Sequence, residues 1–201
     1  QETARAIEAA GFDMLTIWDH LDPQLSWGPA LTAAALATGT LRVGTLVLDN
    51  NYRHPVLVAM EAATLATLTA GRFELGLGAG WRPENYTRAG LPFDPPGVRA
   101  GRLIESVRII KQLFGQEPVT FAGEHYTLAG QPGVMPEGVA PPPLTLGAGG
   151  PRMLRFAARE ADVVGIIPQA LPAGGLDIAD LAPASLEAKI ALVREVAAGR
   201  A

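Results

Sequence analysis

Short apolar runs alternate along this chain with stretches in which apolar residues recur every three or four positions. The runs are typical of strands buried in a parallel sheet, and the periodic stretches are typical of helices that cover such a sheet. We expect strands at 12–18, 41–48, 73–77, 144–146 and 162–167, and helices at 3–10, 29–37, 55–68, 99–114, 153–160 and 185–198. A further segment, VTFAGEHYTL at 119–128, predicts a β-hairpin.

A strand followed by a helix, repeated about five times, predicts a parallel sheet with helices outside it. Two architectures satisfy this order. One is an open doubly wound sheet, and the other is a closed barrel of about eight strands. The periodicity alone does not separate them.

A glycine-rich stretch follows the strand expected at 73–77 and runs RFELGLGAGWRPENY. A dinucleotide-binding turn needs G-x-G-x-x-G, with the last glycine for helix packing. Here Gly76 and Gly78 are followed by Trp81 at the third position. The acidic residue expected about 20 residues later would be Asp94, which lies in FDPPG and not in a strand. The dinucleotide fingerprint is therefore not met.

A second glycine-rich stretch, GAGGPRM from Gly147, also follows a strand and precedes a helix. Two such strand ends suit a barrel whose site is ringed by the loops after its strands. Glycine allows a ligand to approach the backbone, and a helix N-terminus can hold a phosphate. The alternative is that these glycines only relieve crowding at the strand ends.

Polar residues stand at the ends of two expected strands. Asp19 and His20 close the first, and the segment DNNYRH from Asp49 follows the second. A histidine can donate or accept a proton near neutral pH, and an adjacent carboxylate can orient it or hold a ligand hydroxyl. The alternative is ordinary loop chemistry, with His54 only preceding a helix that a proline opens.

Composition narrows the class of protein. The chain has 201 residues, is 48% hydrophobic and carries a net charge of −4, which suits one globular domain over 1–201. It has no clustered basic face, so we expect no nucleic-acid partner. The absence of cysteine excludes disulfides and thiolate catalysis, and the three separated histidines predict no metal site. Its apolar stretches are too short to cross a bilayer, so we expect no membrane association and a cytoplasmic location.

Several segments, taken in order, resemble the bacterial luciferase-like family of flavin and deazaflavin oxidoreductases. They are AIEAAGFDMLTIWDH, LRVGTLVLDNNYRHPVLVAMEAATLATLTAGRFELGLGAGW, RLIESVRIIKQLF, TFAGEHYTL and LTLGAGGPRMLRFAAREAD. The details WDH, RHP and GAGW look most like the branch that uses the deazaflavin F420. The resemblance implies a TIM (β/α)8 barrel with the ring at the carboxyl ends of its strands. Against that template, the first strand and the last two βα units are missing, and insertions lie at about 82–98 and 116–142.

The resemblance also implies site residues. His20 matches the active-site histidine beside the reactive ring carbon. The Leu46–Val47 bond matches a non-prolyl cis peptide that supports the ring from behind. The other matching positions imply contacts to the ring, to the tail of the cofactor and to its phosphate, and they are Asp19, Asp49, Ala79, Gly80, Glu84, Gly149, Gly150, Arg152 and Met153.

Departures from the family pattern refine the expected function. Flavin-using luciferases carry arginine at the position of Ala79, so its absence favours F420 over FMN. Trp81 replaces an acidic residue of the sugar-phosphate dehydrogenases, and GIIPQAL at 165–171 lacks groups that would hold a phosphate. The resemblance therefore implies an F420-dependent oxidoreductase that transfers a hydride to or from a small, fairly apolar substrate, in a possible homodimer. The alternatives are an FMN-dependent monooxygenase that uses O2 and a non-catalytic flavin-binding barrel.

Overall fold

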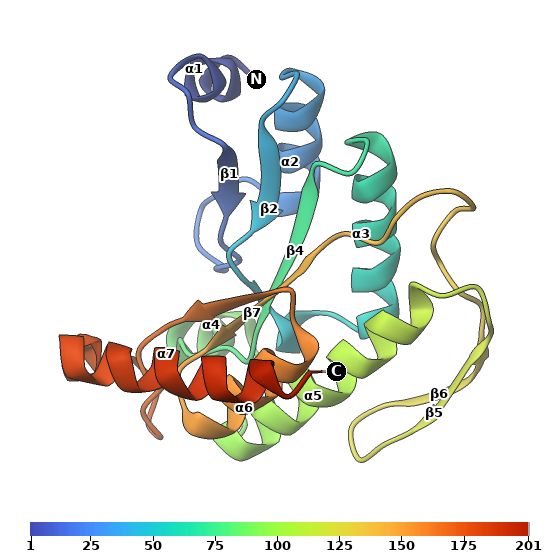
Figure 1. Ribbon diagram of the computed structural model, residues 1–201. Helices are drawn as coiled ribbons and strands as arrows, with labels where there is room; N and C mark the ends of the chain where they lie inside the picture. The colour runs from blue at the N-terminus through green and yellow to red at the C-terminus, as the bar shows by residue number, and fades with distance from the viewer. Residues whose placement is uncertain (201) are drawn as a thin grey trace.

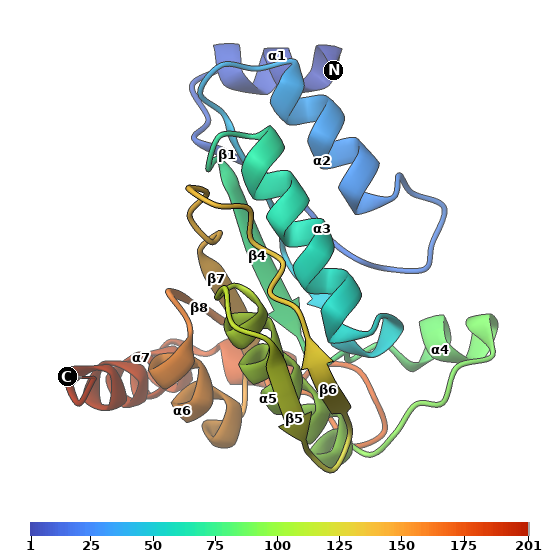
Figure 2. The ribbon, with the colours of Figure 1, turned by 90° about the vertical axis from the view of Figure 1, so that its right-hand side faces the viewer.

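A computed structural model of the protein describes residues 1–200 and shows a curled parallel sheet flanked by helices (Figures 1 and 2). Neighbouring strands of this sheet pair in parallel, in the order β1-β2-β4-β7-β8, and β3 pairs with β4. The strands are β1 (Met14–Ile17), β2 (Arg42–Thr45), β3 (Leu48–Asp49), β4 (Phe73–Gly78), β7 (Leu144–Ala148) and β8 (Val163–Ile166). The predicted parallel sheet is confirmed.

The strand order separates the two architectures that the sequence leaves open. Apart from β3, the strands lie in the sheet in their order along the chain. Every crossover therefore steps in the same direction, as in a (β/α) barrel, whereas a doubly wound sheet reverses direction at a switch point. Within residues 1–200, β1 and β8 are the free edges and do not pair with each other. The sheet is a segment of a barrel, as expected.

Helices connect the strands and cover one side of the sheet. In Figure 2, α2 and α3 run next to each other; α2 packs on β1 and β2, and α3 packs on β4. The helices are α1 (Glu2–Ala9), α2 (Trp27–Leu36), α3 (Pro55–Leu68), α4 (Pro83–Ala89), α5 (Pro96–Leu113), α6 (Pro151–Glu160) and α7 (Pro183–Ala198), with short 3-10 turns η1 (Asn50–Tyr52) and η2 (Ile178–Leu181). No helix among residues 1–200 has both the length and the apolar character that crossing a bilayer requires.

The core lies between β4 and the helices around it. All six residues of β4 are buried, which agrees with the short, largely apolar run that predicted it; its one charged residue, Glu74, is paired with Arg42 at 2.6 Å. Helix α5 contributes Leu103, Val107 and Ile110 to the same core, at the helical spacing expected from the sequence. The core therefore fixes the carboxyl end of β4, where the glycine-rich stretch begins.

The hairpin predicted after α5 is also present. It consists of β5 (Val119–Ala122) and β6 (Thr127–Gln131), which pair in antiparallel fashion. The Glu105 carboxylate on α5 accepts hydrogen bonds from the backbone N–H groups of Glu124, His125 and Tyr126 at 2.8–3.1 Å. These bonds hold the turn of the hairpin to the helix, and the Tyr126 ring in this turn meets the His54 ring, which follows β3, with 5.4 Å between centroids.

Two segments differ from the sequence prediction. The strand expected at 41–48 is divided into β2 and β3, because the Leu46–Val47 peptide bond is cis and interrupts the extended chain. The segment 82–98, expected as a Pro/Gly-rich insertion, contains α4. Pro83 opens this helix, and Gly90, with a φ of 69°, ends it in the left-handed region. Both differences lie beside the site.

Candidate functional site

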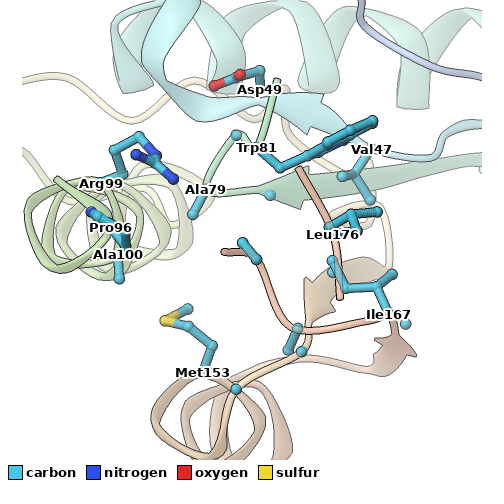
Figure 3. A pocket seen from close by; sticks show the side chains of 18 of the residues that line it. Val47, Asp49, Ala79, Trp81, Pro96, Arg99, Ala100, Met153, Ile167 and Leu176 are labelled. Atoms are coloured by element: carbon cyan, nitrogen blue, oxygen red, sulfur yellow. The ribbon is translucent and has the colours of Figure 1, made fainter. Parts of the chain in front are cut away.

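A cavity of about 500 Å³ lies at the carboxyl ends of the parallel strands. Figure 3 shows Pro96, Arg99 and Ala100 on one side of it, and Val47, Ile167 and Leu176 on the other. Eleven of the twelve predicted site residues line this cavity: Asp19, His20, Leu46, Val47, Asp49, Ala79, Gly80, Gly149, Gly150, Arg152 and Met153. The twelfth, Glu84, is exposed on α4 and does not line it. Sequence reasoning therefore located the cavity, and the roles of these residues remain predictions.

The cis peptide places the Val47 side chain against the glycines of the neighbouring strands. A Cβ at Gly78 would lie 2.6 Å from the Val47 side chain, and one at Gly76 would lie 3.2 Å from it. On β7, a Cβ at Gly147 would lie 3.4 Å from the Val47 side chain. These glycines relieve crowding, which was the alternative explanation for them. Their absent side chains let Val47 form an apolar wall of the cavity.

Asp19 is buried, and both of its carboxylate oxygens accept hydrogen bonds from groups of the protein. Its carboxylate accepts two hydrogen bonds from the Arg53 guanidinium, at 2.5 and 3.0 Å, and one from the backbone N–H of Asp49 at 3.1 Å. Two-point binding of this kind is strong and holds both groups in fixed positions. Asp19 therefore fixes the segment after β2, and none of these hydrogen bonds goes to the adjacent His20.

A second buried carboxylate, Asp49, lies behind the glycine-rich stretch. It accepts hydrogen bonds from the Tyr86 hydroxyl at 2.5 Å and from the backbone and side-chain N–H groups of Asn51, both at 2.9 Å. Burial raises the pKa of Asp49 against the opposing effect of these bonds. Burial and the charge of Asp49 also raise the pKa of Tyr86, so its phenol remains a donor.

The same pair explains why position 80 is a glycine. Gly80 has a φ of 76°, and a Cβ there would overlap the Tyr86 hydroxyl and the Asp49 carboxylate. The backbone of Ala79 is held nearby, because its carbonyl accepts a hydrogen bond from Asn51 at 2.9 Å. The Ala79–Gly80 segment is therefore fixed from behind while it lines the cavity.

His20 lines the cavity with its ring between two aromatic side chains. Its ring meets that of Trp81 edge-on, with 5.7 Å between centroids, and lies 6.4 Å from that of Trp18. Its Nδ1 atom lies 3.1 Å from the side-chain nitrogen of Asn85, a fully buried residue of α4. His20 is thus a proton-bearing group in an otherwise largely apolar part of the cavity.

The opposite part of the cavity suits an anion. Helix α6 begins after Gly150 without a side-chain cap, so the free backbone N–H groups of its first turn point toward the cavity end. Arg152 in this first turn has no carboxylate partner within residues 1–200 and contacts the Gly97 carbonyl at 3.5 Å. The buried Nε of Arg99 has no hydrogen-bond partner. These unpaired groups match a phosphate or carboxylate ligand.

The loop after β8 closes the cavity on the side of Trp81. The backbone N–H of Gly175 donates to the Trp81 carbonyl at 3.0 Å, and Gly174 packs against Pro83. Leu176, in the same loop, and Ile167, just after β8, line the cavity beside Trp81 (Figure 3). This end of the cavity is apolar, in contrast to the end at α6.

Sequence reasoning missed several residues that hold the site together. Arg53, Tyr86 and Asn85 were not predicted, although each bonds to a predicted residue. Asn85 and Tyr86 belong to α4, which was not expected to be a helix. The available signal was Pro83 followed seven residues later by Gly90, the usual residues at the start and end of a helix.

The strand order defines a (β/α)-barrel protein, and its cavity lies where such barrels bind their ligands. A model of the luciferase-like monooxygenase family matches residues 1–200. The chain therefore belongs to the luciferase-like monooxygenase family, as the resemblance of its motifs implied.

Relatives and solved structures support this membership. An F420-dependent glucose-6-phosphate dehydrogenase from Kineococcus radiotolerans is 37% identical over 77% of this chain and 48% of its own length. An F420-dependent hydroxymycolic acid dehydrogenase from Mycobacterium tuberculosis is 37% identical over 79% of this chain and 46% of its own. An F420-dependent secondary alcohol dehydrogenase, solved with an F420-acetone adduct, has a TM-score of 0.80 at 24% identity and covers 100% of this chain and 60% of its own. The chain thus spans about half the length of the curated relatives it matches.

Proposed function

We propose that this protein is an F420-dependent oxidoreductase that transfers a hydride between the deazaflavin and a small organic substrate. The observation that carries this proposal is the division of one cavity into an apolar part and an anion-binding part. Val47 and the Ala79–Gly80 backbone provide a flat apolar surface, and the N-terminus of α6 with Arg152 provides the anion-binding end. F420 combines a flat ring with a phosphate-linked tail, so its shape matches this division.

The residues present suit this cofactor. Gly150, Arg152 and Met153 would hold the phosphate of the tail at the start of α6, and Arg99 adds a buried positive charge on the facing helix α5. Val47, at the cis bond Leu46–Val47, lines the cavity and would lie behind the ring. Bound there, the deazaflavin supplies or accepts the hydride, and the protein binds the ring and excludes water from it.

The choice of F420 over FMN rests on Ala79 and on the relatives. By family resemblance, flavin-using luciferases carry arginine at the position of Ala79. The two curated relatives described above are both named as F420-dependent, and each is 37% identical to this chain over the aligned residues. F420 is therefore the favoured cofactor, and an FMN-dependent monooxygenase is the alternative to be tested.

We propose that the substrate is fairly apolar rather than a sugar phosphate. Trp81, Ile167 and Leu176 line the cavity beside His20, and the segment 165–171 contains no lysine, arginine or hydroxyl side chain. Arg82, which lines this end, is paired with Asp22 at 2.6 Å. A carbonyl, imine or activated alkene would suit these surroundings, with His20 supplying or accepting the proton that accompanies the hydride.

Replacement of His20 tests the proposal in the full-length protein. With reduced F420 and a good acceptor, His20→Ala should slow turnover by about 10²–10⁴-fold, the usual contribution of a positioned acid or base. The dissociation constant for F420 should change little, because Val47 and α6 still hold the cofactor. The matched control is His125→Ala, since His125 lies on the hairpin and outside the cavity. Unchanged turnover in His20→Ala would remove His20 from the mechanism.

A further inference from the structure

The neighbour of His20 that controls its ring is on α4, not on β1. The carboxylate of the adjacent Asp19 is occupied by Arg53 and by the Asp49 backbone N–H. The group that faces a ring nitrogen is the buried Asn85 amide, at 3.1 Å from Nδ1. An amide offers either a donor or an acceptor to that nitrogen, depending on how it is turned.

The surroundings of Asn85 decide how the amide is turned. Its other side-chain atom, Oδ1, lies 3.4 Å from the Arg88 guanidinium, one turn further along α4. A guanidinium has only donors, so the atom that faces it must be the amide oxygen. The amide NH2 group therefore points to His20. If the amide were turned over, its NH2 group would face a cation, and the guanidinium would lose one of its acceptors.

Arg88 is itself held in place. Its guanidinium donates to the Asp22 carboxylate at 3.0 Å and to the Glu84 carbonyl at 3.2 Å. The other oxygen of Asp22 accepts from Arg82 at 2.6 Å, so one carboxylate joins the two arginines. The network therefore runs from Asp22 through Arg88 and Asn85 to the His20 ring.

We propose that Asn85 is a positioning residue that holds neutral His20 as the tautomer with its proton on Nε2. Because Nδ1 accepts the Asn85 N–H, it carries no proton, and the single ring proton resides on Nε2. An Nε2–H group donates a hydrogen bond. His20 therefore offers a donor to an oxygen or nitrogen atom of the substrate, such as a carbonyl oxygen. The tautomer follows from the hydrogen-bond geometry and does not require the proposed function. The effect of the tautomer on turnover does rest on the proposed function.

The Asn85→Asp variant should reverse the tautomer. Aspartate keeps the shape of asparagine but presents only acceptors when it is ionised. Its carboxylate would draw the proton to Nδ1 and leave Nε2 as an acceptor. In Arg88→Met, the amide loses the cation that orients it, so both tautomers should be populated. Arg88 is at the surface, so this second variant tests the proposal even if the buried aspartate prevents folding.

Nitrogen-15 NMR of the imidazole at a pH where the ring is neutral measures the tautomer directly and needs no cofactor. The His20 signals are assigned by their loss in His20→Gln, and circular dichroism checks that each variant is folded. We expect protonated Nε2 in the full-length wild-type protein, protonated Nδ1 in Asn85→Asp and a mixture in Arg88→Met. Protonated Nδ1 in the wild type, or no change in the Arg88→Met variant, would overturn the proposal.

Kinetics separate this proposal from the proposed function. With reduced F420 and a carbonyl acceptor, Asn85→Asp should lower kcat by about tenfold or more, up to the 10²–10⁴-fold that a positioned acid or base contributes. The dissociation constant for F420 should remain unchanged, because Asn85 does not line the cavity. If the protein does not bind F420, the proposed function fails while the NMR result still decides the tautomer.

Discussion

At the scale of single residues, the glycines of the RFELGLGAGW stretch are required by the atoms that lie against them. Gly76 accommodates the Thr45 carbonyl, Gly78 accommodates the Val47 side chain, and Gly80 accommodates the hydrogen-bonded pair of Asp49 and Tyr86. The backbone of Gly78 to Gly80 lines the cavity, and buried side chains pack against it. Position 80 therefore carries two constraints, a left-handed φ and a lack of space for a Cβ.

Alanine at Gly80 and at Gly90 separates these constraints. Both residues have positive φ, which costs an L-residue about 1–2 kcal/mol, but a Cβ at Gly90 meets no atom within 4 Å. Gly80→Ala should lower the free energy of unfolding by a further 1–3 kcal/mol or so, since the chain must shift to relieve the overlap. Urea denaturation of both variants measures the difference. Equal losses at the two positions would show that Gly80 is not crowded.

Eleven of the twelve site residues assigned from the sequence line the cavity, whereas the residues that support them were missed. Motif resemblance assigns residues that line the site, such as Val47 and Arg152, because their positions follow the ends of recognisable strands and helices. It placed Glu84 at the site, whereas Asn85 and Tyr86 point inward from α4. Successive residues of a helix point about 100° apart, so the inward face of α4 depends on where the helix begins. That start is set by packing that the sequence pattern does not show.

At the scale of elements, exposed loops are held by single carboxylates. Asp180 accepts hydrogen bonds from Lys189 and Ser185 of α7 and from the Gln169 backbone at 2.8 Å, and Lys189 also donates to the Ile167 carbonyl at 3.0 Å. These bonds join α7 to the loop after β8, which closes the cavity beside Trp81. The conformation of this loop is therefore held by the charged Asp180 carboxylate.

The contribution of Asp180 to stability should disappear in acid. Its bonds with Lys189, Ser185 and the Gln169 N–H lower the pKa of Asp180 to about 2 in the folded protein. Since the unfolded value is about 3.9, the contribution is complete above that pH and is lost as the pH falls toward 2. The stability difference between wild type and Asp180→Asn should be constant from about pH 5 to 7 and shrink between about pH 4 and 2.

The control for this experiment is Asp13→Asn, an exposed aspartate in the turn before β1. Urea denaturation at each pH gives the free energies of unfolding for the three proteins. A difference between wild type and Asp180→Asn that persists unchanged down to pH 2 would contradict the assignment.

The alternation of strands and helices was predictable because each element carries its own periodicity. The largely apolar run of β4 and the regular spacing in α5 required no tertiary information. The apolar pattern of LRVGTLVL did not show the break between β2 and β3, although the family resemblance predicted the cis bond at Leu46–Val47 that lies at the break. Helix α4 has seven residues in a segment rich in proline and glycine, and it packs through Tyr86 rather than through an apolar stripe.

At the scale of the whole molecule, the chain forms one side of a barrel and with it a cofactor-sized cavity. The strand order runs in one direction from β1 to β8, and the loops after β1, β3, β4, β7 and β8 all contribute lining residues. The anion-binding end and the ring-supporting wall both come from residues 1–200. The central claim is therefore that this chain holds F420, with its phosphate at the start of α6.

Fluorescence titration of the full-length protein with F420 and with FMN tests this claim most directly. We expect tighter binding of F420, and Arg152→Gln should raise its dissociation constant about tenfold, equivalent to about 1.4 kcal/mol. The control is Arg155→Gln. Arg155 lies one turn further along α6 and outside the cavity, so this variant should leave binding unchanged. Tighter binding of FMN, or equal affinities for F420 in the two arginine variants, would contradict the account.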